Sequence, residues 1–212
     1  MRKTLLSILV STLLLSPALQ AQGNSPQAPA RPMRWDVGVR LSSLVAINAK
    51  DSYDAVFGGT MMRYGAQIEF RPAAHFLLSL AGETGSKTGE RVLPTKPPIR
   101  TGVPEKLTLT PIHLSVAWIF HPEANVNWYA GAGPTFLSWK DSSGADHNSG
   151  SDTGMHLVGG VRWQSAGRLS VGGEVRYSTV PNAVGNAGIT KLYNEDDLGG
   201  ISISLIALWR VH

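Results

Sequence analysis

Apolar and polar residues alternate along most of this chain with a period of two. In residues 168–180, Val171 and Val175 would point to one side of an extended strand, whereas Glu174 would point to the other. The same alternation recurs along the rest of the chain. It predicts eight strands, over residues 34–45, 61–71, 75–85, 107–120, 127–139, 154–164, 168–180 and 200–211.

The connections between these strands alternate between short and long. The short ones are rich in turn residues and fall at 72–74, 121–126 and 165–167. The long ones fall at 46–60, 86–106, 140–153 and 181–199. Short periplasmic turns opposite long external loops, with an even strand number, are typical of outer-membrane barrels. We therefore predict an all-β fold, an eight-stranded antiparallel up-and-down transmembrane β-barrel over residues 34–212.

One face of the predicted strands carries no charge, as contact with lipid requires, because a basic residue at the bilayer midplane costs about 2–4 kcal/mol. In residues 127–139 the alternation is ambiguous, and we expect Gly131 and Gly133 to face inward, where small residues relieve crowding. The other expected outward residues are Val37, Val39, Leu41, Ala66, Ile68, Leu78, Leu80, Ile112, Leu114, Val116, Leu157, Val161, Leu169, Val171, Val175, Ile201, Ile203 and Leu205.

The opposite face carries many charges, which would point into the barrel. Eight strands enclose an interior just wide enough for side chains to fill. Charges buried there have to be paired. An ion-selective lumen is the alternative, but a water-filled pore usually needs more strands. We therefore predict a polar network that seals the lumen, made of Arg40, Arg63, Glu69, Glu83, Arg162, Glu174 and Arg176.

Aromatic residues gather near the ends of the predicted strands, where a barrel meets the lipid headgroups. At the other end from the short turns lie Tyr64, Phe136, Trp139 and Tyr177. A soluble core has no reason to sort its tryptophans onto one rim. We therefore predict an aromatic girdle at the short-turn end, made of Trp35, Phe70, Phe76, Trp118, Phe120, Trp128, Trp163 and Trp209.

The first residues of the chain indicate that the protein is exported, and the composition excludes several other classes of site. Residues 1–21 are typical of a signal peptide: Arg2 and Lys3 precede an apolar stretch shorter than the roughly 20 residues that span a bilayer, and small-residue cleavage sites follow. Residues 22–33 are rich in proline and predict a flexible periplasmic lead-in. Cleavage would lower the formal net charge from +4 to +2, and no basic stripe favours nucleic acid. The chain has no cysteine, which excludes disulfides and thiolate metal sites.

Two reactions occur on small outer-membrane barrels, acyl transfer to lipid A and its deacylation, and both use a histidine with a serine or carboxylate near the outer rim. Asp146, His147 and Ser149 fall together in the third long connection. However, this tract of serine and glycine offers no rigid support, which catalysis requires. We therefore interpret it as a surface loop and not as a catalytic site.

The remaining candidate residues also favour structural roles. His113 and Ser115 would both face the lumen, and we interpret His156 with Glu174 as a satisfied interior pair. The acidic stretch Glu195–Asp197 could share a divalent cation with lipopolysaccharide phosphates, but without further ligands a solvated loop is the better interpretation. We expect no catalytic residue, no cofactor and no metal.

Two adjacent segments carry a family resemblance. Residues 109–122 read Leu-Thr-Pro-Ile-His-Leu-Ser-Val-Ala-Trp-Ile-Phe-His-Pro, and they lead into Trp-Tyr-Ala-Gly-Ala-Gly-Pro at 128–134. A proline-containing strand that runs to a Phe-x-Pro turn, followed by a Tyr-x-Gly-x-Gly strand, resembles the OmpW family of small outer-membrane barrels. The resemblance implies eight strands and passage of small hydrophobic compounds through a gap in the barrel wall. The chain departs from the family in its final His212, where exported barrels carry an aromatic residue, and in loops without a family motif.

We therefore expect a non-enzymatic integral protein of the cell outer membrane. It would serve as an envelope scaffold, a surface-loop binder or a narrow conduit for small solutes, including hydrophobic ones. The expected partners are outer-membrane lipid and lipopolysaccharide, with the barrel assembly machinery and periplasmic chaperones during export, and we expect a monomer. Two alternatives are a barrel enzyme that modifies lipid A and a soluble secreted barrel that binds an apolar ligand.

Overall fold

The computed structural model describes residues 33–95, 97–144, 146–165, 167–183 and 188–211. The expected signal peptide, the lead-in up to residue 32 and His212 lie outside these residues. The elements are β1 (Arg34–Val45), a 3₁₀ turn (Ile47–Ala49), α1 (Lys50–Val56), β2 (Met61–Ala73), β3 (Phe76–Leu93), β4 (Ile99–Phe120), β5 (Val126–Ser143), β6 (Asp146–Gln164), β7 (Leu169–Thr179), α2 (Gly188–Tyr193) and β8 (Gly200–Arg210). Neither of the two described helices is long and apolar enough to cross a membrane.

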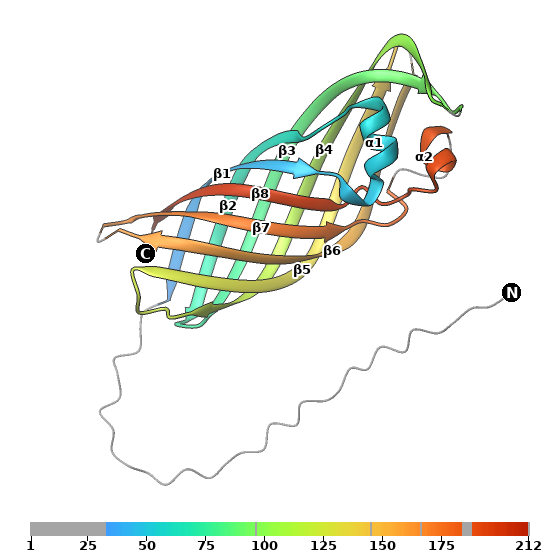
Figure 1. Ribbon diagram of the computed structural model, residues 1–212. Coiled ribbons are helices and arrows are strands. Elements are labelled where there is room, and N and C mark those ends of the chain that lie inside the picture. The colour runs from blue at the N-terminus through green and yellow to red at the C-terminus, as the bar shows by residue number, and fades with distance from the viewer. Residues whose placement is uncertain (1–32, 96, 145, 166, 184–187, 212) are drawn as a thin grey trace, which may run out of the picture. The chain divides into compact units, whose positions relative to one another are not determined.

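The eight strands form a closed barrel in which each strand pairs with its neighbours in sequence (Figure 1). All pairs are antiparallel, and β1 closes the ring against β8, with Leu41 opposite Leu205. Closure gives every strand of the ring a neighbour on both sides, which a sheet in a hydrocarbon environment requires. The predicted eight-stranded up-and-down barrel is confirmed.

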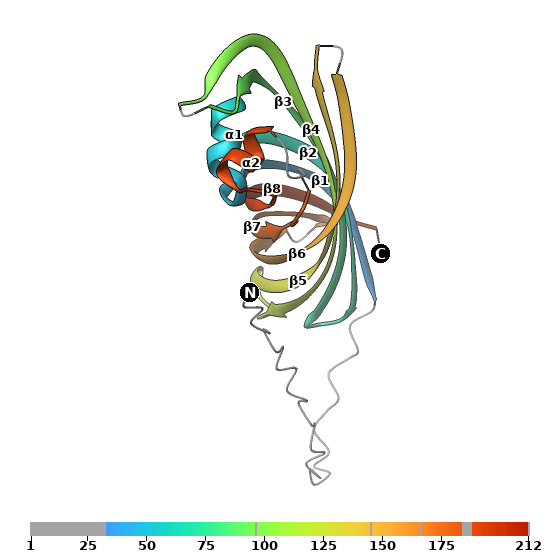
Figure 2. The same cartoon turned by 90° about the vertical axis from the view of Figure 1, so that its right-hand side faces the viewer.

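Two of the four expected long loops are instead strand. The β3–β4 and β5–β6 hairpins extend well beyond the other strands at one end of the barrel (Figure 1). Residues 86–93 pair with residues 99–108, and residues 140–143 pair with residues 146–149. These segments contain turn-forming residues such as Gly89 and Ser142, but cross-strand pairing, with one register shift between Glu90 and Val92, overrides that local preference. The other two connections contain α1 and α2, which touch each other over the same end in both views (Figure 2).

The outward face of the barrel is an apolar band. Val39, Ile203 and Leu205 are 63%, 60% and 68% exposed, and the other residues expected outward also face away from the lumen. A soluble protein rarely leaves so large an apolar surface uncovered. The band therefore requires an apolar solvent around the barrel.

The interior of the barrel has two apolar layers with a polar layer between them. The prediction of a wholly polar interior did not include the apolar layers. Apolar side chains fill the lumen near the short turns, where Leu77, Ile119 and Val158 pack together. The polar residues described below occupy the middle. A second apolar cluster, which includes Leu44 and Leu137, lies toward the long hairpins.

Glycines in β5 and β6 make room for inward side chains. Gly131 faces the buried Ala117 inside the barrel, so the expected inward register of β5 is confirmed. A side chain at Gly160 would overlap the phenol ring of Tyr129, which lies across the lumen-facing surface of β6. Gly160 therefore permits Tyr129 to reach the centre of the lumen.

The pairing between β4 and β5 is interrupted in the middle of the barrel wall. His113 pairs with Thr135, and the next pair is Val116 with Ala132. The two residues between them on each strand are not paired. Pro134 lies in the skipped part of β5 and has no N–H to donate to β4. The interruption is local, because β5 and β6 pair without a break past Pro134.

Candidate functional site

The structure places all seven residues of the expected lumen network inside the barrel, each no more than 4% exposed. Arg40 lies at the centre. Its guanidinium contacts Glu83 Oε1 at 2.5 Å and Glu174 Oε1 at 2.7 Å, and it donates to Gln67 Oε1 at 2.7 Å. Arg63 contacts Glu83 at 3.1 Å, and Arg176 contacts Glu174 at 2.7 Å.

A second part of the network is a two-pronged ion pair between β6 and β2. The Arg162 guanidinium donates to both Glu69 oxygens, at 2.5 and 2.6 Å, and lies over the Tyr129 ring at 5.1 Å. Gln67 donates to Glu69, and the Tyr129 hydroxyl donates to Glu174 at 2.9 Å. These contacts join the two parts into one connected set of side chains that crosses the lumen.

The composition of this network suits a plug and not a water-filled channel. The expected residues contribute four arginines and three glutamates, so nearly every charge has a partner of opposite sign. Removing such charges from water is costly, and the cost is offset only when the pairs have good geometry and further hydrogen bonds. The seven buried side chains occupy the middle of the lumen, as the predicted plug requires.

Two lumen histidines join a separate hydrogen-bonded cluster. Thr135 Oγ1 lies 3.0 Å from His113 Nδ1 and 2.9 Å from His156 Nδ1, and Ser115 Oγ lies 2.8 Å from His156 Nε2. The expected pair of His156 with Glu174 is wrong, because Glu174 binds Arg40, Arg176 and Tyr129 instead. Ser115 and His156 have the spacing of a nucleophile and its base, but they are 1% and 2% exposed. A substrate has no access to them.

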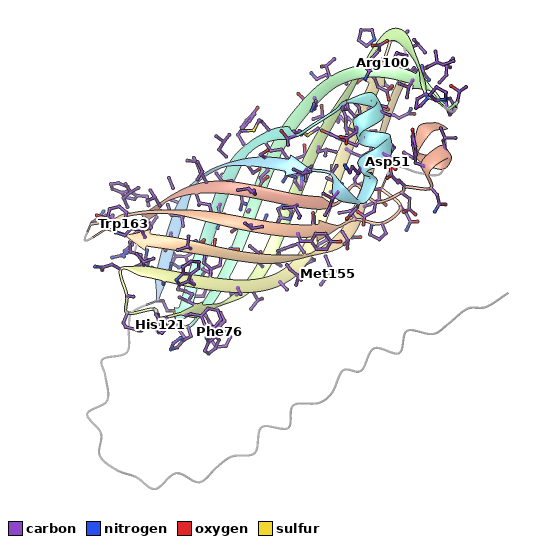
Figure 3. All side chains as sticks on the ribbon, viewed as in Figure 1. Asp51, Phe76, Arg100, His121, Met155 and Trp163 are labelled. Carbon is purple, nitrogen blue, oxygen red and sulfur yellow. The ribbon has the colours of Figure 1, made fainter. Side chains whose placement is uncertain are left out.

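The residues of the expected aromatic girdle all lie near the short-turn end and point outward. Seven of the eight are between 44% and 59% exposed, and Phe70 is partly covered by stacking on Trp35 at 4.5 Å. Figure 3 shows Phe76 and Trp163 at this end, opposite Asp51 and Arg100. Of the four aromatics expected at the other end, Tyr64, Phe136 and Tyr177 point outward. Trp139 does not, because it packs against the inner apolar cluster.

The candidate catalytic residues of the third connection lie on β6, at the tip of a hairpin. Successive strand residues point to opposite faces, which separates the Asp146 carboxylate from the His147 ring. Asp146 binds Arg91 at 3.0 Å instead. The tract is strand and not the expected loop, but it does not assemble a triad.

The acidic stretch at 195–197 holds the end of the barrel together, so its interpretation as a solvated loop is wrong for two of its three residues. Glu195 accepts hydrogen bonds from the backbone N–H groups of Asp51 and Ser52 at 3.1 and 2.7 Å, and thereby caps the start of α1. Asp197 accepts from the N–H groups of Val180 and Gly199 at 2.7 and 2.6 Å. Asp196 is exposed.

A pocket of about 620 Å³ opens at the end of the barrel that carries the long hairpins. This volume suits a small molecule. The pocket lies next to the inner apolar cluster, with which it shares Tyr53, Leu107 and Leu198. Its walls come from α1, α2, the extended hairpins and the segment before β8. The apolar and aromatic lining residues are Ala49, Tyr53, Val56, Phe57, Val92, Leu93, Pro94, Leu107, Trp139 and Leu198.

Polar groups in the pocket wall lack partners. Tyr53 Oη, Trp139 Nε1 and Asp141 Oδ1 are buried without a hydrogen-bond partner among the described residues. Burial raises the pKa of Tyr53 to about 12, so the phenol stays neutral. Burial, with the nearby carboxyl of Asp141, raises the pKa of Glu105 to about 7. Both carboxyl groups lie on the hairpin extensions, beyond the residues that close the ring.

Sequence reasoning missed this pocket because it treated its walls as loops. The inward register of Gly131 and Gly133 already places Leu137 and Trp139 on the inner face, and continuing it past residue 139 would have added Asp141. That signal was present, but the serine- and glycine-rich composition that follows masked it.

No protein-family model matches the sequence, and no curated protein matches it. Solved structures match the fold at low identity. The outer membrane protein OprG of Pseudomonas aeruginosa is 7% identical with a TM-score of 0.61, and the match covers 84% of this chain and 96% of OprG. The Yersinia pestis attachment invasion locus protein Ail, solved with the heparin analogue sucrose octasulfate, is 12% identical with a TM-score of 0.52 over 84% of this chain and 97% of Ail. Neisserial surface protein A is 13% identical with a TM-score of 0.51 over 84% and 96% of the two chains. The chain thus has the fold of the small eight-stranded outer-membrane β-barrels, consistent with its resemblance to the OmpW family.

Proposed function

We propose that this protein is a non-enzymatic outer-membrane barrel that binds a small, mainly apolar solute in the pocket at its extracellular end. The short turns face the periplasm and the long hairpins face outward, as in barrels of this type. The apolar band contacts lipid, and the aromatic girdle lies at the inner interface. One chain closes the ring by itself, which is compatible with a monomer.

The observation that carries the proposal is the position of the pocket. A cavity of about 620 Å³ with aromatic walls lies above a lumen that contains buried ion pairs. A charged or strongly polar solute would gain little binding free energy from contact with Phe57, Leu107 and Trp139. An apolar solute would be stabilised there, because its surface is removed from water. The paired lumen below excludes a continuous aqueous path, so a bound solute would leave toward the lipid or back outward.

The experiment measures binding of 1-octanol by titration calorimetry to the protein in lipid nanodiscs, with empty nanodiscs subtracted. Trp139→Ala removes an aromatic wall and should weaken binding about tenfold or more. Trp128→Ala removes an outward tryptophan of the same strand and should leave binding unchanged. Equal loss in both variants, or no saturable heat in the wild-type protein, would refute the proposal.

A further inference from the structure

One wall of the pocket carries two carboxyl groups. Glu105 on β4 and Asp141 on β5 both line it, and neither is exposed. They lie on neighbouring strands, where Leu107 is opposite Asp141 and Ser143 is opposite Glu105. Two carboxyl groups placed this close in a partly buried wall disfavour ionisation of both at once in the empty pocket.

One cation, Arg91, favours the ionised forms of both carboxyl groups, but it is shared with a third carboxylate. Arg91 on β3 is the cation among the described lining residues, and its guanidinium is engaged by Asp146 on β6 at 3.0 Å. From α1, Tyr53 lines the same pocket with a neutral phenol, and the Lys87 ammonium lies 5.7 Å from the centroid of its ring. The balance of carboxylates over guanidinium leaves this end of the pocket acidic.

The same end has acceptors and donors without partners. Asp141 Oδ1 is buried and accepts no hydrogen bond from the described residues. Tyr53 is only 4% exposed, and its hydroxyl, like Trp139 Nε1, has no partner in the described part of the chain. Tyrosine and tryptophan faces also attract cations. Lys87 already lies over the Tyr53 ring, so a ligand with a donor-rich, positively charged head would satisfy the carboxylate oxygen and contact the Trp139 ring.

We propose that the pocket selects amphiphilic cations, in which an apolar body carries a protonated amine, and that the amine binds between Glu105 and Asp141. This inference rests on the proposed function, because the apolar body occupies the pocket described above. The ammonium donates to the carboxylate oxygens, and the alkyl part contacts Phe57, Leu107 and Trp139.

Binding of such a cation is coupled to a proton. Burial and the neighbouring carboxyl hold the pKa of Glu105 at about 7, so near neutral pH the pair shares a proton. The ammonium favours the doubly ionised pair, so the proton leaves to solvent when the ligand binds. Affinity therefore rises with pH through this range, by about tenfold between pH 6 and pH 8.

The test uses three probes with one chain length: octylammonium, 1-octanol and octanoate. Each is titrated into the full-length protein in zwitterionic nanodiscs, and binding is read from the indole N–H resonance of Trp139. At pH 8, octylammonium should bind at least tenfold more tightly than 1-octanol, and octanoate should bind most weakly. Glu105→Gln and Asp141→Asn should each abolish this preference and the pH dependence. Glu90→Gln changes a carboxylate of β3 that does not line the pocket, and it should change neither.

The outcomes separate this inference from the proposed function. If 1-octanol binds as tightly as octylammonium, or octanoate binds best, selection of cations is wrong while the apolar pocket stands. If none of the three probes shifts the Trp139 resonance, the proposed function is wrong as well. If the preference persists in both carboxyl variants, the cation binds elsewhere and the assignment to Glu105 and Asp141 is wrong.

Discussion

The buried pair of Arg162 and Glu69 allows the plug to be tested by its energetics. Replacing Arg162 with methionine keeps most of the aliphatic volume but removes both hydrogen bonds to Glu69, at 2.5 and 2.6 Å, and the contact with the Tyr129 ring. Glu69 would then keep one described donor, Gln67 Nε2 at 2.6 Å. Breaking a buried pair by removing one partner costs about 3–5 kcal/mol, because the other charge stays buried. An ion pair in a water-filled channel would resemble a surface pair, which contributes about 0.2–1 kcal/mol.

The assay is unfolding by urea in lipid vesicles, followed by tryptophan fluorescence and by the shift in gel mobility between folded and unfolded barrels. Arg162→Met should lower the free energy of unfolding by about 3–5 kcal/mol. The double variant Arg162→Met/Glu69→Leu should recover most of that loss, because no unpaired charge remains. Arg100→Met breaks an exposed pair with Glu90, at 3.5 Å, and serves as the control with a loss below about 1 kcal/mol. If Arg162→Met costs no more than Arg100→Met, water reaches the pair and the lumen is not closed.

Three further predictions follow from the same structure. In planar bilayers the wild-type protein should give no steady ionic conductance, since the lumen network is buried and paired; a stable ohmic current would contradict the plug. Glu195→Gln should speed hydrogen exchange at the first amides of α1, through a loss of about 1 kcal/mol, whereas the exposed Asp196→Asn should not; equal exchange in both would refute the capping role. Gly160→Ala should destabilise the barrel by about 1–3 kcal/mol, because its methyl group overlaps the Tyr129 ring, whereas the methyl group of Gly159→Ala makes ordinary van der Waals contact with the Tyr129 carbonyl oxygen at 3.8 Å and should be tolerated; the same urea assay distinguishes them.

The fold was largely predictable from the sequence because a membrane barrel imposes a period of two on every strand. The charge-free set that includes Val39 and Leu205 identified the outward face, and Arg40 and Glu174 identified the inward one. Even the ambiguous β5 followed from crowding, with Gly131 inside. Charged residues on the lipid-facing side are destabilising near the bilayer midplane, so the alternation of apolar and polar residues is easy to recognise in the sequence.

The pocket was not predictable in the same way, because local composition and tertiary pairing disagree there. Residues 86–106 and 140–153 contain turn formers, yet they continue as paired strands. Trp139 was assigned to the outer belt by its position near a strand end, whereas alternation carries it inward. Glu195 caps a helix about 140 positions earlier in the chain, a contact that the sequence pattern does not encode.

The central claim is that the apolar face of the barrel contacts hydrocarbon and the polar face is enclosed. The chain has no cysteine, so single cysteines can carry nitroxide labels without background changes. Labels at Val39, Leu80 and Ile203 should collide readily with oxygen and poorly with a water-soluble nickel complex, while a label at the inward Ser79 should be shielded from both. Labels at Val39, Leu80 and Ile203 that are shielded from oxygen, with Ser79 in contact with the acyl chains, would contradict the account.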